Sequence, residues 1–155
     1  MNMTVQKNRN ILIAVDESDN AKRAVLYVKD LLAGLSGFHI TIATIIPQPP
    51  EDYFITEQEK NTWVESQNRA AERILADYRQ IFIQAGFRKE DVVSHLVMKE
   101  CSSLAECILE EQGKLSCGTV VIGRRGISKK EEFMFGSTSN KILHTAKDCS
   151  VWVIE

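Results

Sequence analysis

Four small residues near the end of the chain have the types and spacing of a phosphate-binding segment. Gly123, Gly126 and Gly136 are separated by two and nine residues, and Ser137 follows the last glycine directly. Glycines allow a backbone to approach a polyphosphate closely. The first amides of a helix, with hydroxyls such as those of Ser137 and Thr138, donate hydrogen bonds to an anion. The spacing therefore predicts a site for a phosphorylated ligand.

The charges around these glycines fit the same interpretation. Four basic residues and two acidic ones lie in this segment: Arg124, Arg125, Lys129, Lys130, Glu131 and Glu132. The same residues also suit a purely structural role, in which Gly123 and Gly126 make a turn, Gly136 and Ser137 cap a helix, and the charges are solvated. Spacing alone leaves both interpretations open.

Alternating strands and helices are predicted to position this segment. Apolar, β-branched runs predict strands at 11–15, 39–46, 91–98, 119–122 and 151–154. Apolar residues spaced by three and four predict helices at about 21–35, 57–85 and 102–113, and a last helix through 142–146. This order predicts an α/β fold: an open five-stranded parallel sheet with helices on both faces, in a single domain. In such sheets a ligand binds at the carboxyl ends of the strands, where the winding reverses.

Length, composition and charge exclude several classes of function. The chain has 155 residues, of which 44% are hydrophobic and 26% charged, as in one soluble globular domain. Its net charge of −2 gives no strong field for nucleic acid or anionic lipid. The apolar run from Ile11 to Val15 is too short for a signal peptide or a membrane span. We therefore expect neither nucleic acid nor membrane as a partner.

The cysteines and histidines show no pattern typical of a disulfide framework or a metal site. No CxxC pair or regular framework is formed by the four cysteines Cys101, Cys107, Cys117 and Cys149. We therefore expect them to be small buried apolar side chains in a reducing compartment, the cytoplasm. The three histidines lie in different predicted elements without ligand spacing, so we expect no metal site. The GxxxxGK[ST], GxGxxG, GxSxG and HExxH motifs are also missing.

From Ile11 to Ile154 the sequence resembles the universal stress protein family. The matching segments are ILIAVDES, ITIATIIP, TVVIGRRG, GSTSNKIL and CSVWVI, and the chain has the G-x2-G-x9-G-[S/T] pattern of the ATP-binding members. The resemblance implies a Rossmann-like fold of the adenine nucleotide alpha-hydrolase type. Residues 1–10 would be a flexible segment and residues 11–155 the universal stress protein domain. The chain departs from the family at Ser150, which replaces a usual proline, and at Gly118–Thr119, which replace an acidic residue.

The same resemblance implies an adenine nucleotide site. Val15 and Asp16 would lie beside the adenine, with Ile45 packed on the base, and the glycine segment would hold the ribose and phosphates. The nine implied residues are Val15, Asp16, Ile45, Gly123, Arg124, Gly126, Gly136, Ser137 and Thr138. Taken without the resemblance, Asp16 equally suits a helix N-cap and Ile45 suits an ordinary strand core.

The implied function is that of a cytoplasmic, ATP-binding universal stress protein acting as a nucleotide-dependent regulator or stress-tolerance factor. No residue that would position water for hydrolysis is recognisable, so we expect slow or no turnover. Whether Mg²⁺ accompanies ATP is left open. Two alternatives remain: a family member that binds no nucleotide and acts as a dimerising interaction module, and an enzyme such as a slow ATPase or a nucleotidyl transferase.

The last predicted strand suggests a second partner. Val151 and Val153 point to one face and Trp152 and Ile154 to the other, so both faces are apolar. Universal stress proteins commonly pair this strand across a two-fold axis, which implies a homodimer. The alternative is that the 47–56 loop protects the strand within one chain.

Overall fold

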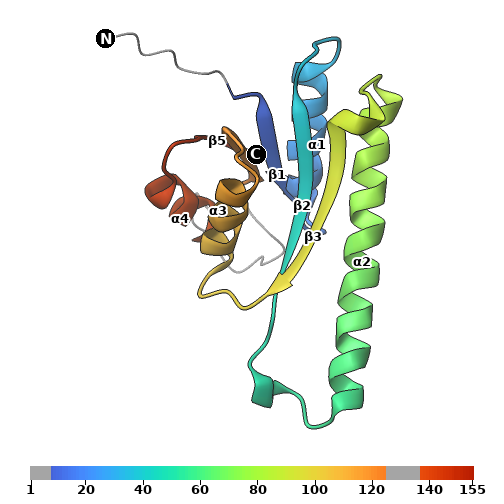
Figure 1. The fold of residues 1–155 in the computed structure, drawn as a ribbon, viewed down its shortest axis with the longest axis vertical. Coiled ribbons are helices and arrows are strands. Elements are labelled where there is room, and N and C mark those ends of the chain that lie inside the picture. The colour runs from blue at the N-terminus through green and yellow to red at the C-terminus, as the bar shows by residue number, and fades with distance from the viewer. Residues whose placement is uncertain (1–7, 125–136) are drawn as a thin grey trace.

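The fold is built on a parallel sheet whose strand order is β3-β2-β1-β4-β5 (Figure 1). The computed structural model describes residues 8–124 and 137–155. Its strands are β1 (Asn10–Ala14), β2 (His39–Pro47), β3 (Val92–Lys99), β4 (Thr119–Gly123) and β5 (Ser150–Ile154). The chain winds from β1 to β3 on one side and from β4 to β5 on the other, so the winding reverses between β1 and β4. The predicted open parallel sheet is confirmed.

Four helices connect the strands and cover both faces of the sheet, as predicted. They are α1 (Asp19–Leu32), α2 (Glu57–Gln84), α3 (Leu104–Lys114) and α4 (Ser137–Thr145). Helices α1 and α2 pack on one face, and α3 and α4 on the other. Two short 3₁₀ turns that the sequence did not suggest, η1 (Glu51–Tyr53) and η2 (Lys89–Asp91), lie in the connections. Over the ranges described, none of the helices combines the length and the apolar character that crossing a membrane requires.

Alternating side chains of the sheet fill two separate cores. In β1, Ile11 and Ile13 point toward α1 and α2, whereas Leu12 points toward α3 and α4. This alternation follows from the two-residue period of a strand, and burial on both faces explains the continuous apolar run. Phe82 of α2 is the largest fully buried side chain on the first face. In β5, Trp152 and Ile154 pack in the first core and Val151 and Val153 in the second, which is the alternation predicted from the sequence.

Only the C-terminal half of α2 packs against the sheet. Its buried residues are Ala71, Leu75, Tyr78 and Phe82, and the N-terminal half extends past the strands together with η1 (Figure 1). Trp63, in the N-terminal half, therefore lies outside the core. The side chain is half-buried, with its ring centroid 5.6 Å from that of Phe54.

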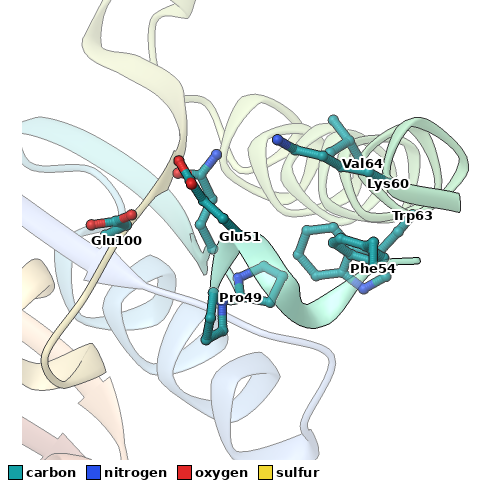
Figure 2. Close-up of a pocket in the computed structure, with 9 residues that line it drawn as sticks. Pro49, Glu51, Phe54, Lys60, Trp63, Val64 and Glu100 are labelled. Atoms are coloured by element: carbon teal, nitrogen blue, oxygen red, sulfur yellow. The ribbon is translucent and has the colours of Figure 1, made fainter. Parts of the chain in front are cut away.

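The loop at 47–56 packs beside this projecting end of α2. Figure 2 shows a small pocket between them, with Phe54 and Trp63 in contact and Glu100 across the opening. The Gln48 amide donates to the Lys99 carbonyl oxygen (2.8 Å), which ties the loop to the end of β3. The alternative in which this loop protects β5 is wrong, because β3 and β5 are opposite edges of the sheet.

Two cysteines correct an expectation from the sequence. Cys101 and Cys107 form a disulfide (Sγ–Sγ 2.05 Å) between the connection after β3 and α3. Only Cys117, which is buried, and Cys149, which is half-buried, have free thiols. The return of the chain from β3 into α3 brings the Cα atoms of the pair to 5.8 Å, a distance that sequence spacing does not reveal. The cysteines therefore no longer argue for a reducing compartment.

Candidate functional site

A cavity of about 140 Å³ lies at the carboxyl ends of β1, β2 and β4. This is the position where the winding of the sheet reverses, and where open α/β sheets bind ligands. Its walls come from β1 and the turn after it, from β2 and β4, and from α1, α3 and α4. The lining residues are Ala14, Val15, Asp16, Ser18, Ala21, Ala43, Thr44, Ile45, Leu104, Ile108, Ile122, Gly123 and Thr138.

The cavity brings together five of the nine residues predicted for the site. They are Val15, Asp16, Ile45, Gly123 and Thr138. These residues come from four different elements or turns, so the parallel sheet is what assembles them. Of the remaining four, Gly126 and Gly136 lie outside the described residues. Arg124 and Ser137 are described, but neither lines the cavity.

Asp16 fixes the turn that leads from β1 into α1. Its Oδ1 accepts a hydrogen bond from the Ser18 amide (2.8 Å), and the Ser18 hydroxyl oxygen accepts one from the Ala21 amide (3.2 Å). Ser18 is therefore the N-cap of α1, and the alternative that Asp16 caps the helix is wrong. The Asp16 charge also reaches Tyr78: burial first, and then Asp16, raises the pKa of that phenol.

Thr44 is a site residue that the sequence analysis missed. Its side chain lines the cavity and is 9% exposed, and its Oγ1 donates to the Val15 carbonyl oxygen (3.2 Å). The Val15 amide in turn donates to the Ala43 carbonyl oxygen (2.8 Å). Threonine is common in strands, so nothing in its sequence context distinguished it from an ordinary strand residue. Together these contacts fix the backbone at the cavity floor.

The apolar walls of the cavity include two residues of α3 that were also missed. Leu104 and Ile108 are one helical turn apart and line the cavity together with Ile45 and Ile122. Such walls suit a flat apolar ring, and the Asp16 carboxylate is the acidic group among the lining residues. In the part of the chain that the structure describes, no group of three or more His, Cys, Asp or Glu residues is placed to hold a metal.

Gly123 has a packing role that does not depend on any ligand. A Cβ atom at this position would lie 2.8 Å from the backbone carbonyl carbon of Asn20 and 2.8 Å from its Cβ. The end of β4 therefore meets the first turn of α1 at a distance that only glycine permits. Sequence reasoning assigned this glycine to phosphate approach, and the structure adds a reason that concerns the fold alone.

Arg124 connects the end of β4 to its neighbours. Its amide donates to the Ile154 carbonyl oxygen (2.7 Å), and its own carbonyl oxygen accepts from the Ser139 hydroxyl (2.9 Å). Its guanidinium forms an ion pair with Glu155 (Nη1–Oε1 3.0 Å). The Arg124 side chain is therefore held by Glu155, directly after β5.

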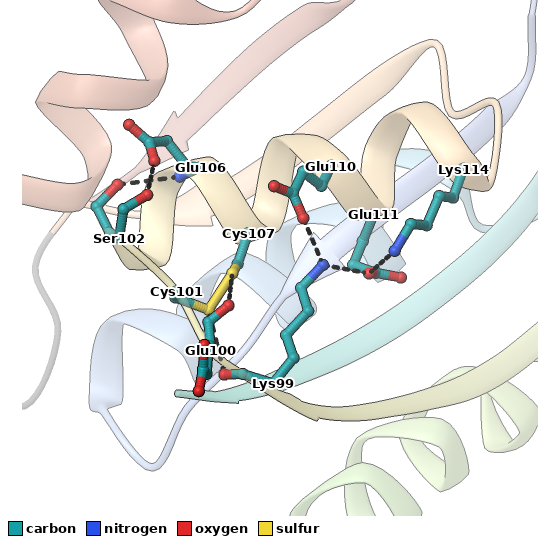
Figure 3. Close-up of a disulfide and its surroundings, with 10 residues drawn as sticks. Lys99, Glu100, Cys101, Ser102, Glu106, Cys107, Glu110, Glu111 and Lys114 are labelled. Carbon is teal, nitrogen blue, oxygen red and sulfur yellow. Dashed lines mark hydrogen bonds and ion pairs between the residues drawn. A yellow bond between two sulfur atoms is a disulfide. The ribbon is translucent and has the colours of Figure 1, made fainter. Parts of the chain in front are cut away.

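A second polar cluster, outside the cavity, joins β3 to α3. The Glu111 side chain is 5% exposed and contacts His95 (2.8 Å), Lys99 (2.8 Å) and Lys114 (3.3 Å). Burial acts to raise the pKa of Glu111, but hydrogen bonds from Lys99, His95 and Lys114 outweigh it and lower the pKa to about 2. Lys99 also pairs with Glu110 (2.7 Å), as Figure 3 shows. We regard this cluster as structural, since its charges are mutually paired.

Comparison with known proteins supports the same fold. The model of the universal stress protein family matches residues 7–155. A universal stress protein from Burkholderia pseudomallei has 18% identity and a TM-score of 0.72, with 95% of this chain and 96% of that one covered. No protein of curated function matches this sequence.

Two further solved structures have nucleotides in their descriptions. A universal stress protein in complex with cAMP has 20% identity and a TM-score of 0.68, with 96% of this chain and 97% of that one covered. The universal stress protein from Archaeoglobus fulgidus in complex with dAMP has 19% identity and a TM-score of 0.66, with coverage of 94% and 97%. At these identities the likeness shows a shared fold.

Proposed function

The chain belongs to the universal stress protein family, and we propose that it binds an adenine nucleotide in the cavity at the carboxyl ends of β1 and β4. One observation carries the proposal. The cavity lies where the sheet winding reverses, and it is lined by Val15, Asp16, Ile45, Gly123 and Thr138, which the family pattern assigns to nucleotide. The complexes of related proteins with cAMP and dAMP support the same ligand class.

The chemistry of the cavity suits an adenosine group. Ile45 and Leu104 offer apolar surfaces for the base, and the Asp16 carboxylate offers an acceptor for an amino group. The Thr138 hydroxyl lies in the first turn of α4, where helix amides favour an anion. We propose that Ser137, Gly126 and Gly136 hold the phosphates, as the family pattern implies.

The proposed ligand is ATP, with or without Mg²⁺, and the proposed role is that of a regulator or stress-tolerance factor with slow or no hydrolysis. A ligand regulates by stabilising one conformation over another, and this requires no turnover. We further propose a cytoplasmic location and a homodimer joined through β5. Among the described strands, none pairs with the outer edge of β5.

The first test identifies any ligand that the protein carries. Protein purified without added nucleotide is denatured, and the released small molecules are identified by mass spectrometry. The emptied protein is then titrated calorimetrically with ATP, AMP and cAMP, with and without Mg²⁺. Copurified nucleotide, or a dissociation constant in the micromolar range, supports the proposal. A protein that binds none of these ligands refutes it.

A pair of neighbouring variants tests the position of the site. Ile45→Ala removes a side chain that lines the cavity, whereas Ile46→Ala makes the same change at the next position of β2, outside the lining. We expect Ile45→Ala to weaken nucleotide binding roughly tenfold, because apolar contact with the base is lost. Ile46→Ala should destabilise the fold to a similar extent and leave affinity unchanged. Equal losses in both variants would place the ligand elsewhere.

The packing of Gly123 favours one alternative function. Because Asn20 leaves no room for a side chain there, this glycine is required whether or not a nucleotide binds. A member of the family that binds no nucleotide and acts as a dimerising interaction module would keep it as well. Failure of every titration, together with a stable dimer in solution, would support this alternative.

A further inference from the structure

The disulfide lies against the wall of the candidate nucleotide cavity. Cys101 precedes α3 and Cys107 lies within its first turns, so the bond encloses the start of the helix (Figure 3). Leu104, between the two cysteines, and Ile108, next to Cys107, both line the cavity. The state of the bond therefore bears directly on the order of this wall.

Other contacts connect the same turn to α4. The Ser103 hydroxyl oxygen caps α3 by accepting from the Glu106 amide (3.2 Å), and Ser102 hydrogen-bonds to the Glu106 carboxylate. Glu106 also pairs with Lys141 of α4 (2.9 Å). Since Thr138 of α4 lines the cavity as well, two of its walls are joined through Glu106.

From this arrangement we propose that Cys101 and Cys107 are a reversible redox site, whose reduction loosens the α3 wall and weakens nucleotide binding. The effect on binding rests on the proposed function. The chemical partner is a dithiol reductant. In the cytoplasm, the location proposed above, a disulfide is typically a redox-active one.

The two cysteine residues differ in exposure, which sets the order of the proposed reaction. Cys101 is half-buried, whereas Cys107 is 2% exposed. A thiolate of the reductant attacks Sγ of Cys101, forming a mixed disulfide and releasing the Cys107 thiolate, which takes up a proton. The second thiol of the reductant then attacks the reductant's own sulfur in the mixed disulfide and releases Cys101, which is protonated in turn. The reductant leaves as a disulfide, having supplied two electrons and two protons.

The other two cysteines are poorly suited to exchange with this pair. Burial raises the pKa of the Cys117 thiol to about 11, and burial followed by the Asp148 charge raises that of Cys149. Both are therefore protonated at neutral pH, and only a thiolate attacks a disulfide. This confines the chemistry to Cys101 and Cys107.

The first experiment measures the oxidation state of the Cys101–Cys107 pair and the order of the start of α3, in the full chain. Alkylation and mass spectrometry are applied before and after dithiothreitol, and amide exchange is measured in both states. We expect Cys101 and Cys107 to be labelled only after reduction, with amides at 101–108 exchanging about tenfold faster and those of α1 unchanged. Labelling of both cysteines before reduction, or unchanged exchange at 101–108, would overturn the proposal.

The second experiment measures AMP affinity by calorimetry in both states. Reduction should weaken binding roughly two- to tenfold, because the ligand must then order Leu104. The Cys101→Ser variant cannot form the disulfide, so it should bind AMP with the weaker affinity both with and without reductant. In the control variant Cys149→Ser, reduction should weaken AMP binding as in the wild type. Binding of equal strength in both states refutes the coupling. If neither state binds AMP or ATP, the proposed function fails, and the exchange data alone decide whether the redox site controls the wall.

Discussion

Replacing Glu111 with glutamine should destabilise the protein strongly at neutral pH and little in acid. The carboxylate is 5% exposed and is held by His95, Lys99 and Lys114. Its pKa is about 2 in the folded protein, against 4.5 as the ordinary value. At about 1.4 kcal/mol for each pKa unit, this difference corresponds to roughly 3 kcal/mol of folding stability.

The sign of the pH dependence follows from the lowered pKa. A carboxylate whose pKa is lower in the folded state contributes its full stability above the ordinary value of 4.5 and loses it as the pH falls toward 2. The difference in unfolding free energy between wild type and Glu111→Gln should therefore be about 3 kcal/mol at pH 7. It should fall to about 1.4 kcal/mol at pH 3, where the carboxyl group is almost entirely protonated in the unfolded chain but still mostly ionised in the folded protein.

Urea unfolding at a series of pH values, followed by circular dichroism, measures this difference. Glu110→Gln is the matched control, because it makes the same change in the preceding residue and removes a contact to the same Lys99. Its side chain is 60% exposed, so we expect a loss below about 1 kcal/mol at every pH. A Glu111→Gln loss that is equally small, or that stays constant from pH 7 to pH 3, would refute the reasoning.

Three substitutions test the packing, and light scattering tests the assembly. In chemical denaturation, Gly123→Ala should cost roughly 1–3 kcal/mol of stability, because the added Cβ meets the Asn20 backbone. The control Gly113→Ala has open space around the added Cβ and should stabilise α3 by about 0.5 kcal/mol. Phe82→Ala empties a fully buried position and should cost about 3–5 kcal/mol, read from the same denaturation curves. Light scattering should give twice the chain mass of 17.5 kDa, because pairing of two β5 strands removes the free edge; a monomer would refute the dimer.

The sheet was predictable because its signals are local. Runs such as Ile11–Val15 are apolar at every position, which indicates a strand buried on both faces. The glycine at 86 also has the positive φ (+96°) expected at the end of α2. These features depend on neighbouring residues alone, so the sequence contains them directly.

The features that were missed depend on residues distant in the sequence or on the path of a turn. Thr44 became a site residue only because β2 lies beside β1, which places its hydroxyl at the Val15 carbonyl. The cysteine pair depends on how the chain turns from β3 into α3. The cap role that the sequence left open for Asp16 belongs to Ser18, two positions later, which is an equally suitable residue type.

The projecting end of α2 means that one helix contains two levels of local stability. Residues near Leu75 and Phe82 are held by the core, so their hydrogen bonds open only when that face of the sheet is disrupted. The first turns, near Trp63, are held mainly by the helix itself and by Phe54. Helical turns without such packing open readily in water, even where the sequence favours helix. The far end of α2 is therefore free to unwind and refold while the sheet and its cavity remain intact.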